Sequence, residues 1–155
     1  MRRDLLREVA FGQDQLVHEP AAHAFLDVIL QDGFYEELVP RCENFYAEVN
    51  SLMKRLGFRG RIQGKGARFS FLFGPPAERE LRNYQDLLDN SWGLLNRFYG
   101  ACLDHGIYIH TMMHHGLASA HTDEDVERLL KGIEDALKGL MREGLDASEA
   151  PAAPF

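Results

Sequence analysis

The chain has 155 residues, 45% of them hydrophobic, which is enough for one ordinary core and too little for two domains of comfortable size. It carries 17 Lys and Arg against 24 Asp and Glu, and a formal net charge of -7 disfavours nucleic acid and anionic membranes as partners. No apolar stretch approaches the roughly 20 residues that span a bilayer, and no secretory signal is recognisable at the N-terminus. These features predict one compact unit that binds neither nucleic acid nor membrane.

The two cysteines, Cys42 and Cys102, occupy apolar positions of predicted helices and form no CxxC pair. This placement argues against a disulfide framework and against a thiolate metal site. A reducing compartment fits best, so we expect a cytoplasmic protein.

The N-terminal third predicts an arm and two helices. Residues 1–20 form an arm of uncertain structure, because their apolar residues show only a weak helical period. A short helix is expected over Ala21–Gln31, where Asp32 and Gly33 supply the stop. A second helix is expected to begin near Pro40, since proline is tolerated in a first turn, and to end at Gly57.

Two β segments follow the second helix. Phe58–Gln63 and Ala67–Phe73 read as strands, with Gly64–Gly66 as the tight turn of a hairpin between them. The prolines that follow Gly74 break the second strand.

The remaining segments predict two helices and two short strands. A helix with an apolar stripe begins near Asn90 and ends at Gly106, and strand-like segments lie at Ile107–His110 and Gly116–Ala120. The last helix begins at Asp123, after an N-cap threonine with an acid three positions later. We treat residues 143–155 as a flexible tail, since they show no apolar period.

Together these elements predict an α+β fold. We expect a small, mainly antiparallel sheet of about four strands, covered on one face by the helices that begin near Pro40, Asn90 and Asp123. The corresponding domain organisation is an arm at 1–20, one domain at 21–142 and a tail at 143–155.

Histidines are concentrated between residues 105 and 121. A metal site was weighed and is not favoured, because alternating strand faces would separate His110 from His115, and adjacent His114 and His115 rarely share one metal. No acid or cysteine completes a ligand set. The preferred interpretation places His121 just before a helix cap and the other histidines along the edge of a cleft, where imidazole is a common polar and partly apolar side chain.

Two further motifs are better explained by structure than by chemistry. Lys65 lies between glycines but lacks the wider glycine spacing and following hydroxyl residue of a phosphate-binding loop. Ser119 has no nucleophile-elbow context and no acid placed to orient a base. Neither residue predicts a catalytic site.

Four strings, taken in order, carry a family resemblance: GFYEEL from Gly33, GARFSFLF from Gly66, LDHGIY from Leu103 and SAHTDED from Ser119. They resemble the C-terminal small domain of class III pyridoxal-phosphate-dependent aminotransferases, most nearly the glutamate-1-semialdehyde 2,1-aminomutase branch. The resemblance covers roughly residues 21–142.

The resemblance implies a fold-type-I enzyme whose large domain holds pyridoxal phosphate through a lysine and whose small domain closes over the substrate. None of the four lysines, Lys54, Lys65, Lys131 and Lys138, falls in a context like that of the family's cofactor lysine. We therefore expect no catalytic and no cofactor-binding residue in this chain, no activity when it is alone, and a large cofactor-binding domain or a second copy as partner.

The chain departs from the family pattern in the segment that would face the substrate. Many class III enzymes have a carboxylate-binding arginine in a comparable stretch, and no arginine occurs here between Arg97 and Arg128. His110, His114 and His115 are therefore the candidates for a substrate cleft, as hydrogen-bond donors at its mouth. The substrate itself stays open.

Two alternatives remain. The chain could be a cofactor-free, stand-alone dimerisation or protein-binding module, which would form a stable closed oligomer. It could also be a stand-alone enzyme that uses the histidines with a metal, which stoichiometric metal in the purified protein would support.

Overall fold

A computed structural model describes residues 19–111 and 115–147. The chain forms two compact units, Met1–Glu37 and Leu38–Phe155. The predicted arm lies outside the described residues up to position 18. The domain limits 1–20, 21–142 and 143–155 stay a prediction.

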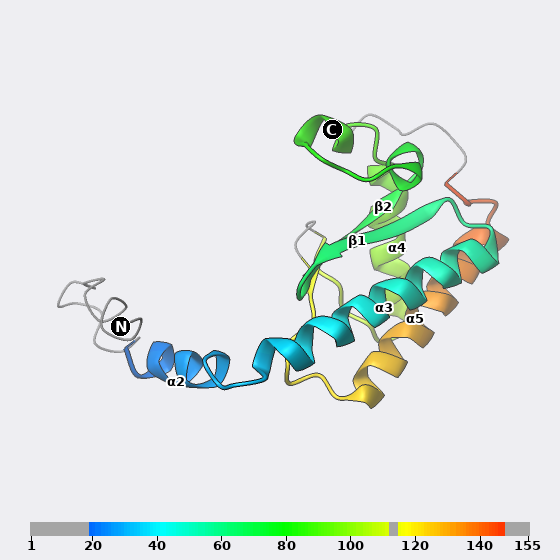
Figure 1. The fold of residues 1–155 in the computed structure, drawn as a ribbon. Helices are drawn as coiled ribbons and strands as arrows, with labels where there is room; N and C mark the ends of the chain where they lie inside the picture. The colour runs from blue at the N-terminus through cyan, green and yellow to red at the C-terminus, as the bar shows by residue number, and fades with distance from the viewer. Residues whose placement is uncertain (1–18, 112–114, 148–155) are drawn as a thin grey trace. The chain divides into compact units, whose positions relative to one another are not determined.

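The first unit contains helix α2, Glu19–Ile29, which begins and ends two residues before the predicted helix (blue in Figure 1). Gly33 has a φ of 87°, a left-handed conformation that glycine adopts without steric cost, and it ends the connection to the next helix. The apolar side chains of Phe25, Val28 and Leu30 are 62%, 44% and 52% exposed. This amphipathic helix therefore presents apolar surface to solvent.

Helix α3, Phe34–Leu56, begins six residues before Pro40, so the predicted start was wrong. Glu36 and Glu37 lie in its first turn, where acids suit the positive end of a helix. Pro40 removes one backbone donor inside the helix, and the remaining turns continue despite that loss. The helix ends as predicted at Gly57, whose φ is 73°.

A hairpin follows, formed by β1, Gly60–Lys65, and β2, Arg68–Phe73. The strands are antiparallel, and Lys65 pairs with Arg68. The turn is therefore centred on Gly66 and Ala67, not on Gly64–Gly66 as predicted. Gly66 has a φ of 56°, which matches the glycine-first two-residue turns that suit the twist of a hairpin.

Strand β3, His115–Gly116, pairs antiparallel with β2 and gives the strand order β1-β2-β3. The described residues thus form three strands, where about four were expected. Ile107–His110 is extended but pairs with no strand among the described residues. Ile107 packs on α5 instead, because Gly132 lets its side chain approach that helix closely.

Helices α4, Trp92–Asp104, and α5, Asp123–Arg142, lie where the sequence predicts them. Gly106, with a φ of 76°, terminates the first, as predicted. Thr122 caps the second: its hydroxyl accepts from the backbone N–H of Asp125 at 3.2 Å, and the Asp125 carboxylate accepts from the backbone N–H of Thr122 at 2.9 Å.

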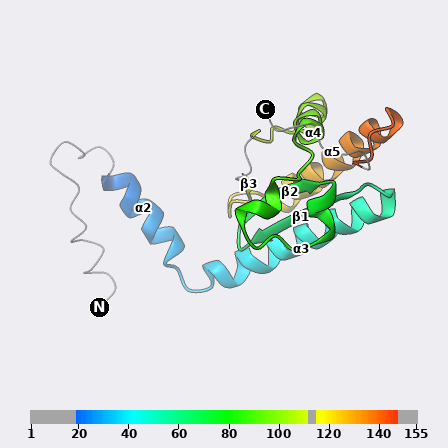
Figure 2. The same ribbon diagram turned by 90° about the horizontal axis from the view of Figure 1, so that it is seen from above.

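The core lies on the face of the sheet that the helices cover (Figures 1 and 2). Alternate residues of β2 project toward them: the ring of Phe69 lies 5.5 Å from that of Phe45 on α3, and the ring of Phe71 lies 5.0 Å from that of Phe98 on α4. The opposite face is covered by the connection that holds short helices η2, Pro75–Glu78, and η3, Tyr84–Leu87. The α+β prediction with helices on one face is confirmed.

The start of the predicted tail packs against this core. Ala147 is buried, and the carbonyl of Asp146 accepts from the backbone N–H of Arg59 at 2.9 Å. Residues 148–155 lie outside the described residues.

Cys42 and Cys102 are both free and buried. Among the described helices, none has the length and apolarity that a bilayer span requires.

Candidate functional site: a histidine-lined cleft

A cleft of about 450 Å³ lies between the segment Gly106–His110, strand β3 and the first half of α5. Its floor is apolar and its rim is polar. The floor is formed by side chains of α3, β2, α5 and the neighbouring loops: Phe45, Phe69, Phe71, Ile107, Leu117, Val126 and Leu129. The rim carries His110, His121, Asp125 and Arg128, and the buried His115 also lines the cleft. Such a combination suits a small molecule with an apolar body and a polar or anionic end.

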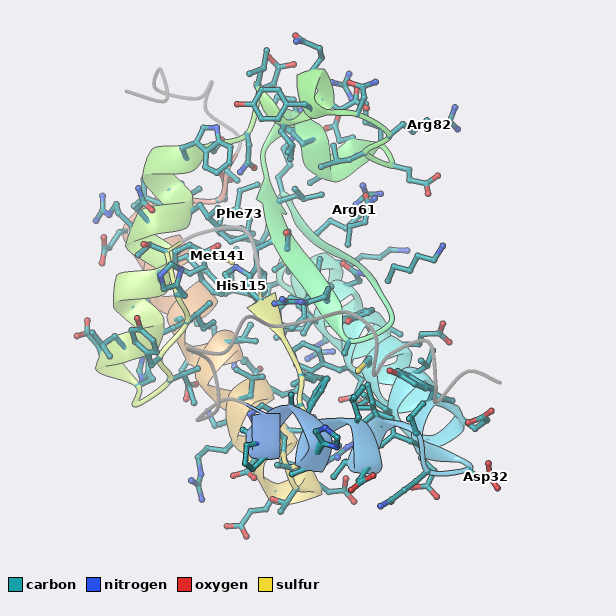
Figure 3. All side chains as sticks on the ribbon, turned by 90° about the vertical axis from the view of Figure 1, so that its left-hand side faces the viewer. Asp32, Arg61, Phe73, Arg82, His115 and Met141 are labelled. Atoms are coloured by element: carbon teal, nitrogen blue, oxygen red, sulfur yellow. The ribbon has the colours of Figure 1, made fainter. Side chains whose placement is uncertain are left out.

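His115 is the buried polar residue of the cleft, with 6% of its surface exposed (Figure 3). The pairing of β3 with β2 places it opposite Phe69, and its ring lies 5.5 Å from the ring of Phe69 and 5.7 Å from that of Phe71. Its Nε2 lies 2.9 Å from the hydroxyl oxygen of Tyr99 on α4. These aromatic rings and the hydrogen bond with Tyr99 therefore orient the imidazole.

Tyr99 is itself buried, and burial raises the pKa of its phenol above the usual value. The hydroxyl consequently keeps its proton at neutral pH. It can donate to Nε2 of His115 when that nitrogen is unprotonated, or accept from it in the other tautomer.

His121 lies at the N-terminal end of α5. Its Nδ1 accepts a hydrogen bond from the backbone N–H of Ala118 at 2.9 Å. The neutral ring therefore carries its proton on Nε2. The backbone and side-chain hydrogen bonds from Thr122 lower the pKa of the neighbouring Asp125 carboxyl, so this acid stays ionised as a helix cap.

Arg128 contributes the cationic group of the rim. It projects from α5 one turn beyond Glu124, with which it forms an exposed ion pair at 3.3 Å. An exposed pair of this kind is weak, so the guanidinium can exchange this partner for a ligand anion at little cost.

The structure brings together more of the histidine-rich stretch than the sequence suggested. His110 and His115 line the same cleft, although alternation along a strand had predicted opposite directions, and His121 joins them. His114 lies outside the described residues. His105 lines a different cavity, beside Asp135 and Lys138.

Three residues of the site were missed by sequence reasoning: Tyr99, Asp125 and Arg128. In the sequence, Tyr99 is one member of an ordinary apolar helix stripe, Asp125 reads as a helix cap, and Arg128 lies on the polar face of the last helix. Within the described parts of the chain, no three His, Cys, Asp or Glu side chains are grouped as metal ligands.

The chain is similar in sequence to known enzymes. It is 27% identical over 122 residues to glutamate-1-semialdehyde 2,1-aminomutase of Desulfitobacterium hafniense, a match that covers 77% of this chain and 28% of that enzyme. It is also 27% identical over 151 residues to glutamate-1-semialdehyde 2,1-aminomutase 2 of Bacillus pumilus, covering 91% of this chain and 34% of that enzyme. The chain thus spans about a third of its relatives' length or less. No protein-family model matches it.

Solved structures share its fold. The FumI protein of Sphingopyxis sp., in its pyridoxal-phosphate internal aldimine form, superimposes with a TM-score of 0.68 and 20% identity, over 94% of this chain and 33% of that one. A β-phenylalanine aminotransferase from Variovorax paradoxus gives a TM-score of 0.64 and 22% identity, over 81% of this chain and 28% of that one. The resemblance to class III aminotransferases, and to the aminomutases by sequence, is confirmed.

The lysines of this chain do not fit a pyridoxal-phosphate site. All four side chains are exposed, and none lines the histidine cleft. Lys131 and Lys138 form ion pairs with Asp135 and Glu134 one turn away on α5. A lysine that holds this cofactor as an imine must lie in the cavity beside it, and no lysine lines the histidine cleft.

Proposed function

We propose that this chain, which resembles glutamate-1-semialdehyde 2,1-aminomutases in sequence and part of an aminotransferase in fold, is the small-domain portion of a class III pyridoxal-phosphate-dependent enzyme. Residues 21–142 form this domain. The cofactor and its lysine belong to a large domain outside the chain, and the chain is inactive without it. The cytoplasm is the proposed location, which two free buried cysteines suit.

The observation that carries this proposal is the cleft, because it offers substrate contacts without a catalytic group. An apolar floor, together with His110, His115 and His121 in the lining, can bind and orient a substrate. His114 belongs to the same proposed set from the sequence. No lysine lines this cleft. The group that makes and breaks bonds is therefore supplied by the large domain.

The exposed apolar face of the first unit supports a partner. Phe25 and Val28 on α2, Leu30 just after it and Tyr35 at the start of α3 are each more than two-fifths exposed. Burying this surface against another protein removes it from water, at roughly 25 cal/mol per Å². We assign the large cofactor-binding domain as its partner, since the relatives are about three times as long as this chain.

The proposal is tested by adding pyridoxal phosphate to the purified chain and recording its absorbance spectrum and its transaminase activity. We expect the spectrum of the free cofactor and no turnover with any amino donor. A saturable imine absorbance band, or turnover by the chain alone, would show that the chain itself holds the cofactor. Either result would refute the proposal that the cofactor and its lysine belong to a separate large domain.

The same apolar face favours a second candidate, a cofactor-free module that pairs with its own copy. Light scattering distinguishes the two, because a module of this kind forms a closed dimer of constant mass. The small-domain proposal predicts a monomer, or association without a fixed end point, until the large domain is supplied.

A further inference from the structure

A second cavity, of about 440 Å³, lies at the outer edge of the sheet and shares no lining residue with the histidine cleft. The last turns of α3, the start of β1 and the helix η2 line it, and it is widely open to solvent. Its lining consists of Asn50, Lys54, Phe58, Arg59, Gly60, Arg61, Ala77 and Glu78. We refer to it as the β1-edge pocket.

Hydrogen bonds and close packing hold the backbone around the β1-edge pocket in place. The Asn50 side chain accepts from the backbone N–H of Ile62 at 2.8 Å and donates to its carbonyl at 3.1 Å, which fixes α3 along the free edge of β1. Phe58 is buried at its base. A side chain at Gly60 would come within 2.9 Å of Met53 and Phe58, so glycine allows the backbone to lie this close.

Three cations and one acid line the β1-edge pocket. Glu78 is the acid, and it pairs with Arg59, whose Nη2 lies 2.7 Å from its Oε1. Lys54 is exposed and forms no ion pair with any described residue. The lining therefore has an excess of positive charge in a protein whose formal net charge is -7.

Arg61 is the most constrained of the three cations. Its Nη2 donates to the side chain of Gln63 at 2.6 Å and to the carbonyl of Arg79, both of which are uncharged acceptors. No described carboxylate lies within ion-pair distance of it, and Glu80 acts on it only from further away. A partly buried guanidinium without a counter-charge is unfavourable, and a bound anion would offset that.

We propose that the β1-edge pocket binds the phosphate group of a small molecule, through Lys54, Arg59 and Arg61. Arginine and lysine are the side chains that bind phosphate in proteins, and a dianion matches two cations that lack a carboxylate partner. The volume lies within the usual range of ligand pockets, about 300 to 1,000 Å³, so it accommodates an organic group as well as the phosphate. The buried ring of Phe58 gives that group an apolar contact.

The test is a titration of the isotope-labelled chain followed by amide chemical shifts, with phenyl phosphate as the probe and ionic strength held constant. We expect saturable shifts at Gly60 and Ala77. Inorganic phosphate in a second titration distinguishes the free ion from the ester. Binding of either one in preference to benzoate supports phosphate recognition. Benzoate, which carries a carboxylate on the same ring, should bind at least about tenfold more weakly, since it loses charge-assisted hydrogen bonds.

Matched variants assign the binding to the pocket. K54A should weaken phenyl phosphate binding about tenfold, as expected for the loss of one charge-assisted hydrogen bond, and E78Q should strengthen it by removing the acid. K65A, which removes an exposed lysine at the other end of β1, should leave the affinity unchanged. The proposal fails if the shifts do not saturate, if benzoate binds as tightly as phenyl phosphate, or if K54A and K65A behave alike.

Discussion

The hydroxyl oxygen of Tyr99 lies 2.9 Å from Nε2 of His115, and both side chains are buried. This hydrogen bond joins α4 to the short strand β3. The bond sets the position of the His115 imidazole, which lines the histidine cleft. Its other partner, Tyr99, approaches His115 from the core. Stability and substrate contacts are therefore linked at this pair.

Replacing Tyr99 with phenylalanine should lower the free energy of unfolding by about 1 to 2 kcal/mol, because it leaves a buried imidazole nitrogen without its partner. Urea denaturation of Y99F and of the parent chain measures this difference.

A double-mutant cycle separates the hydrogen bond from packing. H115L should be destabilised as well, but the double variant Y99F/H115L should be about 1 kcal/mol more stable than the two single effects predict, since both partners of the Tyr99–His115 hydrogen bond are then removed together. Additive effects would mean that the two side chains are not coupled.

Gly132 is the position on α5 where the segment that carries His110 packs closely, through Ile107. An added Cβ would lie 2.4 Å from Cγ1 of Ile107, so G132A should destabilise the chain by about 1 to 3 kcal/mol through overpacking. Thermal or urea denaturation gives the value, and I107A should recover part of the loss in the double variant.

Gly139, on the same helix, supplies the control. A Cβ there meets nothing within 4 Å, so G139A should instead stabilise the chain by about 0.5 to 1 kcal/mol through helix propensity. Equal effects of the two substitutions would contradict the packing of Ile107 on α5.

The buried thiols make stability depend on alkaline pH. Burial raises the pKa of Cys102 to about 12, and it also raises that of Cys42. Unfolded thiols lose their protons from about pH 8.5, so above this pH the folded state binds more protons than the unfolded state. The free energy of unfolding should therefore fall as pH rises from about 8.5 to 10.

Urea denaturation across that range measures the slope. C102A removes one of the two thiols and should give a shallower slope than the parent chain, whatever its effect on stability at neutral pH. An unchanged slope would show that the Cys102 thiol does not contribute.

The cleft histidines are predicted to act on substrate in the assembled enzyme. Replacing His110, His114 and His115 together with alanine should lower kcat/KM at least about tenfold, since hydrogen bonds to the substrate are lost. H105A is the matched control, because His105 lines another cavity. Unchanged turnover and affinity in the triple variant would exclude the three residues from the substrate site.

The sequence predicted the helices best where local signals were sufficient. α5 was located from Thr122 and its acid three residues later, and α4 from its apolar stripe and Gly106, because caps and periodicity act within a few residues. The start of α3 was predicted wrongly because proline usually lies in the first turn of a helix. Here the residues on both sides of Pro40 are helical, so the helix begins six residues earlier.

The site could be predicted only in part. The histidine-rich stretch identified a cleft edge, yet the joining of His110, His115 and His121 depends on how the segment after Gly106 packs on α5. Tyr99, on a separate helix, contacts His115 from the core side, and no local pattern in the sequence marks such a contact. The segment Ile107–His110 was predicted as a strand because its sequence is strand-like. In the structure Ile107 packs against Gly132 on α5, and the segment pairs with no described strand.

The central claim is that the cofactor lysine lies outside this chain. The most direct test is to isolate the native assembly from the source cells with an antibody against α5, reduce it with borohydride to fix pyridoxal phosphate on the lysine that holds it, and locate the modified lysine by peptide mass spectrometry. We predict a modified lysine in sequence other than these 155 residues. Modification of Lys54, Lys65, Lys131 or Lys138, or an assembly without any modified lysine, would contradict the account.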